Sequence, residues 1–263
     1  MGIAEQHAVT LSAGMATEGM IVYCTIYSTF LQRAYDQIIH DVALQNLPVI
    51  FCLDRAGLVG QDGATHHGAF DLAYLNCIPN LIIYAPSDEV QLRNMLYTVQ
   101  LGIKHPIAIR YPRGRGVCID WKQAFDTIPF GKSTCIQKGD TIAILTIGTI
   151  IHNVLEAITQ ISEPIGIYDF AFLKPLDTHQ LDLIFKTYDH IITVEDGTII
   201  GGLGSSIADY AFAKAYKGSL TTLGLPDRFI NHGTVDELQE EVGIDVNHIR
   251  STIEKIQKKA GRL

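Results

Sequence analysis

Residues 48–54, Pro48-Val-Ile-Phe-Cys-Leu-Asp54, form an apolar run that begins at a proline and ends at an acid. Between these two residues the apolar side chains follow one another without alternating with polar ones. Such a run is typical of a strand that is buried on both faces of a parallel sheet. The stretch therefore predicts a central strand of an α/β domain.

Strand-like and helix-like stretches alternate on either side of this run. Met20–Ile26 is a second β-branched run that we expect to be buried on both faces. Further strands are predicted at residues 81–86 and 106–112, and helical periodicity is seen at residues 5–18, 28–42 and 87–99. Ser28 or Thr29 is expected to cap the second helix, and Ser87-Asp88-Glu89 is a capping signal for the third. This alternation predicts a parallel sheet with helices on both faces.

Residues 113–140 interrupt the alternation. Arg113-Gly-Arg-Gly116, Trp121 and Gly131 indicate a connector with a short hairpin. The alternation then resumes, with strands expected at 141–147, 165–172, 190–195 and 219–225, helices at 150–161, 176–185 and 205–216, and two more helices before the end. We therefore predict an α/β protein of two domains, residues 1–125 and 126–263, each a mostly parallel sheet with helices on both faces.

Composition narrows the class of protein. The chain has 263 residues, of which 47% are hydrophobic and 18% charged, so it can bury a core. Its net charge of −8 makes nucleic acid a poor partner. The cysteines are odd in number and lack paired CxxC spacing: Cys24, Cys52, Cys77, Cys118 and Cys135. We expect these thiols to be reduced. The sequence also shows no charged leader and no apolar run long enough to span a bilayer. Together these features predict a cytoplasmic protein without a membrane partner.

The N-terminal stretch Met1-Gly-Ile-Ala-Glu5-Gln-His7 places an acid, an amide and an imidazole ahead of a helical pattern. On the residues alone, Glu5 is explained either as a favourable charge near the positive end of a helix or as a working acid. The start is abrupt, because a helix usually opens with a capping residue or a lead-in strand.

Polar side chains follow the ends of three predicted strands. They are Tyr27, Ser28 and Arg33 after the first strand, Arg55, Asp62, His66 and His67 after the second, and Arg110 and Arg113 at the fourth. Ligands of α/β sheets lie beyond the carboxyl ends of the strands, and arginines beside imidazoles suit a phosphate or carboxylate. The alternative is that Arg55 pairs with Asp54 or Asp62 and that the histidines lie on the loop surface.

Several motifs occur in a fixed order along the chain. They are Gly2-Ile-Ala-Glu-Gln-His7, Ile26-Tyr-Ser-Thr-Phe-Leu-Gln-Arg-Ala-Tyr-Asp-Gln37, Asp54-Arg-Ala-Gly57, Asp62-Gly-x-Thr-His-x-Gly68, Tyr111-Pro-Arg-Gly114, Lys174-Pro-Leu-Asp177, Val194-Glu195, Gly201-Gly-x-Gly-Ser205, Leu223-Gly-Leu-Pro-Asp227 and His232-Gly233. This order resembles the 1-deoxy-D-xylulose-5-phosphate synthase family, which is transketolase-like and uses thiamine diphosphate. The resemblance covers essentially the whole chain and implies a pyrimidine-binding domain followed by a transketolase C-terminal domain.

The resemblance implies roles for individual residues in the condensation of pyruvate with glyceraldehyde 3-phosphate, with loss of carbon dioxide. Glu5 would hydrogen-bond the aminopyrimidine ring of the cofactor, and Phe30 would pack on that ring. His66 would act on the substrate as an acid, a base or a hydrogen-bond donor, with Asp62 close to it. The remaining substrate residues would be Tyr27, Arg33, Arg55 and Arg113. The role of Arg110 stays open between substrate binding and structure. His232 is expected to be structural, and His67, where the family often has Gln, is given a weak role.

One part of the family pattern is missing. The Gly-Asp-Gly run with its trailing Asn, which holds the diphosphate and Mg²⁺, has no counterpart here, so no metal ligand is expected in this chain. We therefore expect the chain to need an N-terminal half and to be inactive alone, with a homodimer formed through the C-terminal domain. The alternatives are a subunit of a split transketolase, the β subunit of a 2-oxoacid dehydrogenase, or a non-catalytic dimerising fragment. Glu195-Asp-Gly and Gly201-Gly-x-Gly indicate close strand–helix packing rather than a nucleotide loop.

Overall fold

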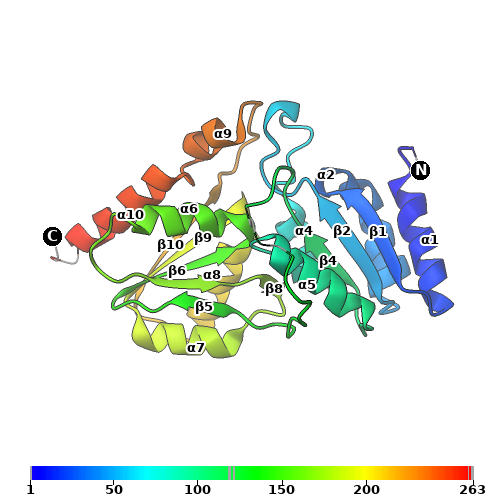
Figure 1. Cartoon of the computed structure of the whole chain (residues 1–263), viewed down its shortest axis with the longest axis horizontal. Coiled ribbons are helices and arrows are strands. Elements are labelled where there is room, and N and C mark those ends of the chain that lie inside the picture. The colour runs from blue at the N-terminus through cyan, green and yellow to red at the C-terminus, as the bar shows by residue number, and fades with distance from the viewer. Residues whose placement is uncertain (1, 118–119, 121, 260, 262–263) are drawn as a thin grey trace.

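The computed structural model describes residues 2–117, 120, 122–259 and 261. Two five-stranded sheets lie one after the other along the long axis of the molecule, and the two termini lie at opposite ends of that axis (Figure 1). This arrangement confirms the predicted two mostly parallel sheets flanked by helices.

The first sheet has the strand order β1-β2-β4-β3-β8. Its strands are β1 (Val22–Tyr27), β2 (Val49–Asp54), β4 (Ile107–Arg110), β3 (Ile82–Tyr84) and β8 (Phe172–Lys174). The pairs β1–β2, β2–β4 and β3–β4 are parallel. The β2 side chains from Val49 to Leu53 are all buried, as the uninterrupted apolar run predicts.

The prediction that residues 20–26 are buried on both faces is wrong. In β1 the buried residues Val22, Cys24 and Ile26 alternate with exposed ones, and Tyr23 is 41% exposed. β1 lies at the edge of the sheet, and the hydroxyl of Tyr23 donates to the carbonyl of Leu96 at 3.1 Å. The neighbouring helix therefore covers this face of β1 only in part.

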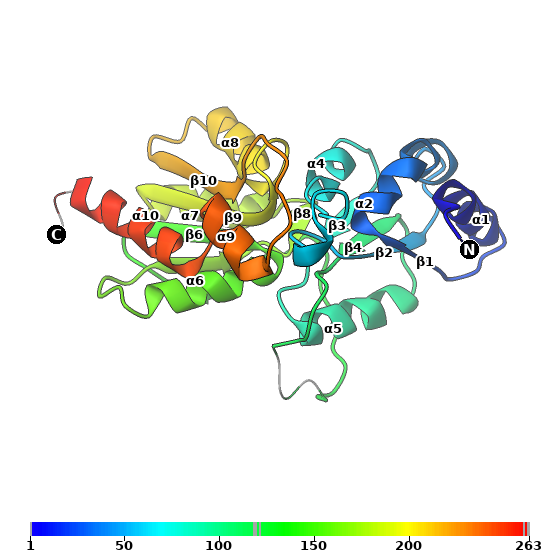
Figure 2. The same cartoon turned by 90° about the horizontal axis from the view of Figure 1, so that it is seen from above.

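Helices cover both faces of the first sheet. Figure 2 shows α1 (Glu5–Thr17), α2 (Ser28–Leu31) and α4 (Asp71–Asn76) on one face and α5 (Glu89–Gln100) on the other. The predicted helix at 28–42 is instead a succession of short pieces: α2, the 3₁₀ turn η1 (Gln32–Ala34), α3 (Tyr35–Gln37) and the π-helical η2 (Ile38–Ala43).

The two predicted helix caps have different outcomes. Asp88 caps α5 by accepting from the backbone N–H of Gln91 at 2.7 Å, as predicted. The cap predicted at Ser28 or Thr29 is wrong, because α2 has Tyr27 at that position without a side-chain bond. Ser28 instead donates its hydroxyl to Asp71 at 2.9 Å, so it supports the site described below.

The second sheet has the strand order β10-β9-β6-β7-β5, with β5 antiparallel to β7 and the other pairs parallel. Its strands are β10 (Ser219–Leu225), β9 (His190–Thr198), β6 (Ile142–Ile147), β7 (Gly166–Asp169) and β5 (Thr134–Gln137). The helices are η4 (Gly148–Ile150), α6 (Ile151–Ile158), α7 (Thr178–Thr187), α8 (Leu203–Ala213), α9 (Val235–Val242) and α10 (Val246–Lys259). Figure 1 shows α6 and α10 on one side of this sheet and α7 on the other.

A strand from the second half of the chain completes the first sheet. The single strand predicted at 165–172 is in fact β7, which stays in the second sheet, and β8, which pairs antiparallel with β3. Phe172 packs on Tyr84 with ring centroids 4.8 Å apart. The ammonium of Lys174 donates to the carbonyls of Asn76 and Ile78 at 3.0 and 2.6 Å. The two sheets are therefore joined by main-chain pairing, side-chain packing and hydrogen bonds.

The connector between the two sheets differs from its prediction. In its described part the only strand is β5, which pairs with β7 across the chain instead of forming a local hairpin. Trp121 lies outside the described residues. The domain boundary near residue 125 falls in this connector and stays a prediction.

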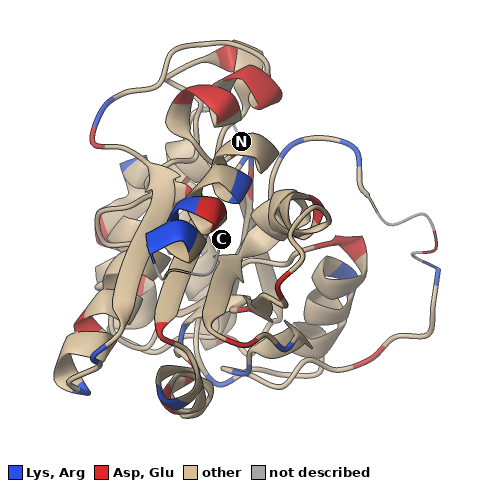
Figure 3. Cartoon of the chain, turned by 90° about the vertical axis from the view of Figure 1, so that its left-hand side faces the viewer, with Lys and Arg blue, Asp and Glu red and all other residues tan. Residues whose placement is uncertain are grey.

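Surface charge and cysteines complete the description. Basic and acidic segments are interspersed over the side drawn in Figure 3, and acidic residues gather on α9. The exclusion of nucleic acid nevertheless stays a prediction. Cys24 and Cys52 are buried free thiols, as expected, Cys77 and Cys135 are exposed, and Cys118 lies outside the described residues. Within the described ranges, none of the helices has the length and apolar character needed to cross a membrane.

The β8 junction gives a prediction for stability. Phe172 is 2% exposed, so Phe172→Ala should lower the free energy of unfolding by about 3–5 kcal/mol, since it leaves a cavity in the core of the first sheet where β8 joins it. Phe212→Ala is the matched control, because Phe212 is 90% exposed and its loss should change stability by less than about 0.5 kcal/mol. Urea unfolding measures both changes. A loss below about 1 kcal/mol for Phe172→Ala would contradict the importance of this junction.

Candidate active site

The polar residues singled out from the sequence lie at the carboxyl ends of the first sheet. Tyr27 ends β1, Arg55 follows β2, and Arg113 follows β4 by a few residues. Arg55 has a φ of 59°, a left-handed conformation that side chains rarely adopt. Strained backbone of this kind is found preferentially at functional sites. Here it turns the chain sharply as β2 ends.

A continuous line of side-chain contacts joins the predicted cofactor residues to the predicted substrate histidine. The guanidinium of Arg33 lies 3.4 Å from the carboxylate of Glu5 and 4.9 Å from the ring centroid of Phe30. The ring of Phe30 meets the imidazole of His66 edge to face at 5.4 Å. Glu5 and His66 are far apart in the sequence, and the fold brings them to one site.

A second line of contacts runs from Phe30 toward β2. Tyr27 stacks on Phe30 with centroids 5.3 Å apart and an interplanar angle of 11°. The guanidinium of Arg55 lies 3.7 Å from the ring centroid of Tyr27 and forms an ion pair with Asp54. The sequence left the partner of Arg55 open between Asp54 and Asp62, and the structure selects Asp54.

The loop that follows β2 carries Asp62 and His66. Asp62 accepts from Arg113 at 3.0 Å in an exposed ion pair. The Nδ1 atom of His66 lies 2.9 Å from the hydroxyl of Thr65, and Thr29 donates to the carbonyl of Thr65 at 3.3 Å. The loop is thereby tied to α2. The alternative that both histidines lie on the loop surface is wrong for His67, which is buried.

Arg110 belongs to a buried network beneath these residues. Its Nε donates to Asp71 at 2.9 Å, and its Nη2 donates to the backbone carbonyl of Asp196 in the second sheet at 3.0 Å. Ser28 donates to the same carboxylate oxygen of Asp71. Burial alone would lower the pKa of Arg110, but the charges of Asp71 and Asp196 outweigh burial and raise it. These contacts are those of a structural residue, a role that the sequence left open for Arg110. The supporting contacts of Ser28, Asp71 and Asp196 were missed.

Glu195 closes this network on the side of the second sheet. Its carboxylate accepts from the backbone N–H groups of Leu203 and Gly204 at 2.8 Å each, at the start of α8. Burial raises its pKa to about 7, although these two hydrogen bonds and Arg110 favour the charged form. A Cβ at Gly202 would lie 2.0 Å from the Glu195 carboxylate, so these glycines serve close strand–helix packing, as predicted.

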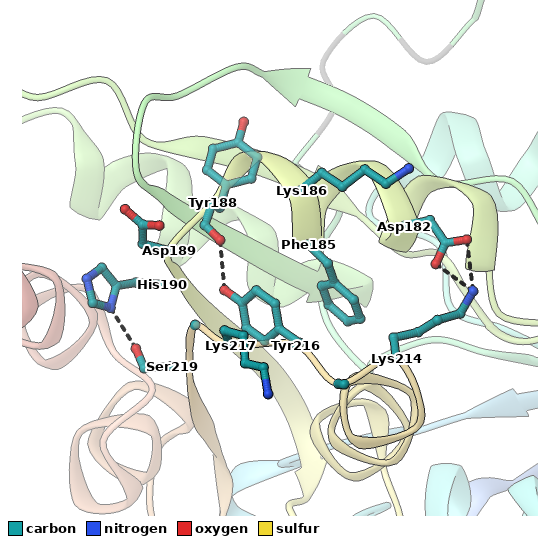
Figure 4. Close-up of a pocket in the computed structure, with 12 residues that line it drawn as sticks. Asp182, Phe185, Lys186, Tyr188, Asp189, His190, Lys214, Tyr216, Lys217 and Ser219 are labelled. Atoms are coloured by element: carbon teal, nitrogen blue, oxygen red, sulfur yellow. Dashed lines mark hydrogen bonds and ion pairs between the residues drawn. The ribbon is translucent and has the colours of Figure 1, made fainter.

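A large surface hollow lies elsewhere. Its volume is about 810 Å³, and it opens at the amino ends of β9 and β10 between Phe185, Tyr216 and several lysines (Figure 4). In this hollow Lys214 pairs with Asp182, and Tyr216 donates to the carbonyl of Tyr188. Ligands of α/β sheets lie at the opposite, carboxyl, edge of the strands. We therefore place the candidate active site at the Glu5–His66 line of contacts and not in this hollow.

Comparison with known families agrees with this geometry. Residues 1–116 match the family described as transketolase, pyrimidine binding domain, and residues 131–249 match transketolase, C-terminal domain. The chain is a transketolase pyrimidine-binding domain joined to a transketolase C-terminal domain. The two matches leave only residues 117–130 of the connector between them, and the contacts of Glu5, Phe30 and His66 all lie in the pyrimidine-binding domain.

Several similar curated proteins carry the same name. The chain is 51% identical to the 1-deoxy-D-xylulose-5-phosphate synthase of Cytophaga hutchinsonii and 50% identical to those of Bacteroides thetaiotaomicron and Chlorobaculum tepidum. These similarities cover 97–98% of this chain but only 40–41% of the relatives. The pyrimidine-binding and C-terminal domains therefore span about two fifths of the length of these synthases.

A solved structure titled "Split gene transketolase, inactive beta4 tetramer" has the same fold. Its TM-score is 0.86 at 27% sequence identity, and the similarity covers 97% of this chain and 82% of that one. The two-domain unit thus occurs in another protein as a chain with little additional sequence.

Two arginines of the pyrimidine-binding domain allow a buried ion pair to be compared with an exposed one. Arg110→Met should lower the free energy of unfolding by about 3–5 kcal/mol, because it leaves the buried Asp71 without its counter-charge. Arg113→Met should cost less than about 1 kcal/mol, because the Arg113–Asp62 pair is exposed to solvent. Urea unfolding of the two variants decides, and equal losses would show that the buried network does not stabilise the junction.

The pKa of Glu195 predicts how stability depends on pH. Its folded-state pKa of about 7 exceeds its ordinary value of 4.5, so the folded state holds the proton more tightly than the unfolded state. The free energy of unfolding should therefore fall as pH rises from 4.5 to about 7, by an amount on the order of 1–3 kcal/mol. Glu195→Gln should remove this part of the dependence. Parallel pH profiles for the two proteins, measured by urea unfolding, would contradict the assignment.

Proposed function

We propose that this chain is the pyrimidine-binding and C-terminal part of a thiamine-diphosphate-dependent 1-deoxy-D-xylulose-5-phosphate synthase. The enzyme would condense pyruvate and glyceraldehyde 3-phosphate with loss of carbon dioxide. The observation that carries the proposal is the unbroken line of contacts from Glu5 through Arg33 and Phe30 to His66. The similarity of about 50% to proteins of that name supports it.

The residues present fit the aminopyrimidine end of thiamine diphosphate. The side chain of Glu5 is 13% exposed, so its carboxylate is sheltered yet accessible, and Phe30 offers a flat apolar ring two contacts away. Glu5 would hold a ring nitrogen of the cofactor and its proton, and Phe30 would orient the ring. When bound, the cofactor supplies the electron sink for decarboxylation, whereas the protein supplies orientation and proton transfer.

The substrate side of the site is basic. Arg55 and Arg113 would hold the phosphate of the aldehyde, since guanidinium groups match phosphate oxygens in a forked geometry. Tyr27 fixes the plane of Arg55 by stacking, and His66 would hold or donate a proton at the reacting oxygen of the aldehyde. Arg33 would set the orientation and charge of Glu5. Asp62 would balance Arg113 until the phosphate arrives.

The diphosphate end of the cofactor would bind elsewhere. Among the described residues, no group of three or more His, Cys, Asp or Glu side chains could hold a metal ion. We therefore propose that the Mg²⁺ ligands belong to an additional N-terminal half, and that the enzyme is a homodimer. A cytoplasmic location remains a prediction from the sequence.

The second candidate function is a subunit of a split enzyme. It is favoured by the similarity to the split gene transketolase, whose title describes an inactive assembly of its β chains. In that case the chain would associate with itself and become active only with a separate diphosphate-binding chain. A β subunit of a 2-oxoacid dehydrogenase and a non-catalytic dimerising fragment are less supported, because neither accounts for the arginine and histidine contacts around Tyr27 and Phe30.

A reconstitution experiment tests the proposal. The chain is mixed with thiamine diphosphate, Mg²⁺, pyruvate and glyceraldehyde 3-phosphate, with and without the separately expressed N-terminal half of the Cytophaga hutchinsonii synthase. We expect 1-deoxy-D-xylulose 5-phosphate only in the complete mixture. Glu5→Gln should lower its rate by about 100-fold or more, because the carboxylate that handles the cofactor proton is lost.

Glu18→Gln is the matched control, because Glu18 caps the other end of α1 and is exposed. It should leave the rate unchanged. Product formed without the N-terminal half would contradict the proposal that half of the cofactor site is supplied from elsewhere. A ketose formed from transketolase substrates, but not from pyruvate, would favour the split transketolase.

A further inference from the structure

The loop that carries Asp62 and His66 is held along its length by the C-terminal domain. A Cβ added to Gly57 would lie 1.9 Å from the carboxylate of Asp196, so only glycine fits there. The backbone N–H of Leu58 donates to both carboxylate oxygens of Asp196, at 3.2 and 3.3 Å. Asp196 is itself half-buried, and the carbonyl of the same residue accepts from Arg110. The first turn of the loop is therefore shaped around an acid of the other domain.

The middle of the loop is held by His67. The backbone N–H of Val59 donates to its Nδ1 at 3.1 Å, and its Nε2 lies 3.1 Å from the carbonyl oxygen of Asn231. A backbone N–H can only donate and a carbonyl can only accept. The proton must therefore reside on Nε2, which makes His67 a neutral imidazole that bridges the two domains. His67 is 4% exposed, so bulk solvent reaches little of the ring.

Two glycines bring the rest of the loop against the same segment. Gly60 and Gly63 have φ values of 83° and 74°. A Cβ at Gly60 would lie 3.2 Å from the carbonyl of Gly233, and one at Gly63 would lie 3.3 Å from the Cβ of His232. The segment from Asn231 to Gly233 therefore follows the loop closely up to the residues that precede His66.

We infer that Asp196 and neutral His67 are positioning residues: they fix the loop that presents His66 and Asp62 to the substrate, and protonation of His67 releases it. We call the hydrogen bonds from Leu58 to Asp196 and from Val59 to His67 the clamp. The consequence for substrate rests on the proposed function, whereas the clamp itself is a property of this chain. Protonation places a second N–H at Nδ1, directed at the N–H of Val59. That hydrogen bond is then lost, and two donors face each other in a buried space.

Charged groups from each neighbouring element act on His67. Asp196 on β9 lies close enough for His67 to influence its carboxylate, and its negative charge favours the protonated imidazole. Arg228, in the segment after β10, lines the same small cavity as His67 and opposes protonation, but its charge is balanced by Glu241 on α9. On the loop itself the neighbouring titratable group is His66. The positive charge of Arg110 acts on Asp196, to whose carbonyl Arg110 also donates.

The chain offers a rescue variant for the test. His67→Gln keeps an acceptor and a donor on one planar amide but cannot titrate, whereas His67→Leu keeps similar bulk and removes both. His179→Gln, at an exposed position on α7, is the matched control. Amide hydrogen exchange of the whole chain, followed by NMR between about pH 8 and about pH 5, reports the protection of Val59 and Leu58. Nitrogen shifts of the imidazoles report the tautomer of His67.

In the unmodified chain and in His179→Gln, we expect Val59 to lose about ten-fold or more of its protection on acidification, because a protonated imidazole can no longer accept from the backbone N–H of Val59. His67→Gln should keep Val59 protected throughout this range, and His67→Leu should leave it unprotected at every pH. If the protection of Val59 does not change with pH, or if it falls equally in His67→Gln, the inference that His67 holds the loop is wrong. A proton on Nδ1 at neutral pH would overturn it as well.

These measurements need no cofactor and no second half. A chain that shows the pH-dependent clamp but gives no product on reconstitution would disprove the proposed function alone. An active reconstituted enzyme whose Val59 protection does not follow His67 would disprove the clamp alone.

Discussion

The pair formed by Arg110 and Asp71 is the interaction on which the arrangement of the molecule depends. Arg110 is the last residue of β4, the central strand of the first sheet. Asp71 begins α4 directly after the loop that bears His66. Both side chains are almost fully buried, so each charge requires the other. By donating also to the carbonyl of Asp196, Arg110 joins the carboxyl ends of both sheets. The site is therefore built on a junction of two domains and not on one domain alone.

The same junction explains why the candidate site residues lie in the pyrimidine-binding domain. In an open α/β sheet the usual binding crevice lies beyond the carboxyl ends of the central strands, here β6 and β9. Gly148 and Asp196 follow or end these strands, and both are approached by Arg110 of the other domain. In this chain, the pyrimidine-binding domain thus occupies the crevice that an isolated C-terminal domain would offer to a ligand. What it presents instead is an acid and a carbonyl that shape the loop of the pyrimidine-binding domain.

The sequence predicts much of this fold and only part of the site. The apolar run from Val49 to Leu53 was sufficient to predict a central strand, because burial on both faces leaves a local pattern. The three residues of β8 were not assigned to the first sheet, since a short strand carries no signal for a distant partner. The strand-end rule correctly gathered Tyr27 and Arg55. It could not find Asp71, Asp196 or the bridging role of His67, because a buried polar residue is explained only by its partners in space.

Each arginine proposed for binding is balanced by a carboxylate, and the degree of exposure separates their roles. Arg113 and Asp62 are 51% and 41% exposed, and a solvent-exposed pair contributes only about 0–1 kcal/mol. An incoming phosphate could therefore take over Arg113 at little cost. Arg55 is more deeply placed, is paired with Asp54 and is stacked on Tyr27, so exchange there would break two contacts. Under the proposed function, Arg113 would therefore capture the phosphate, and Arg55 would be the fixed group against which the substrate is oriented.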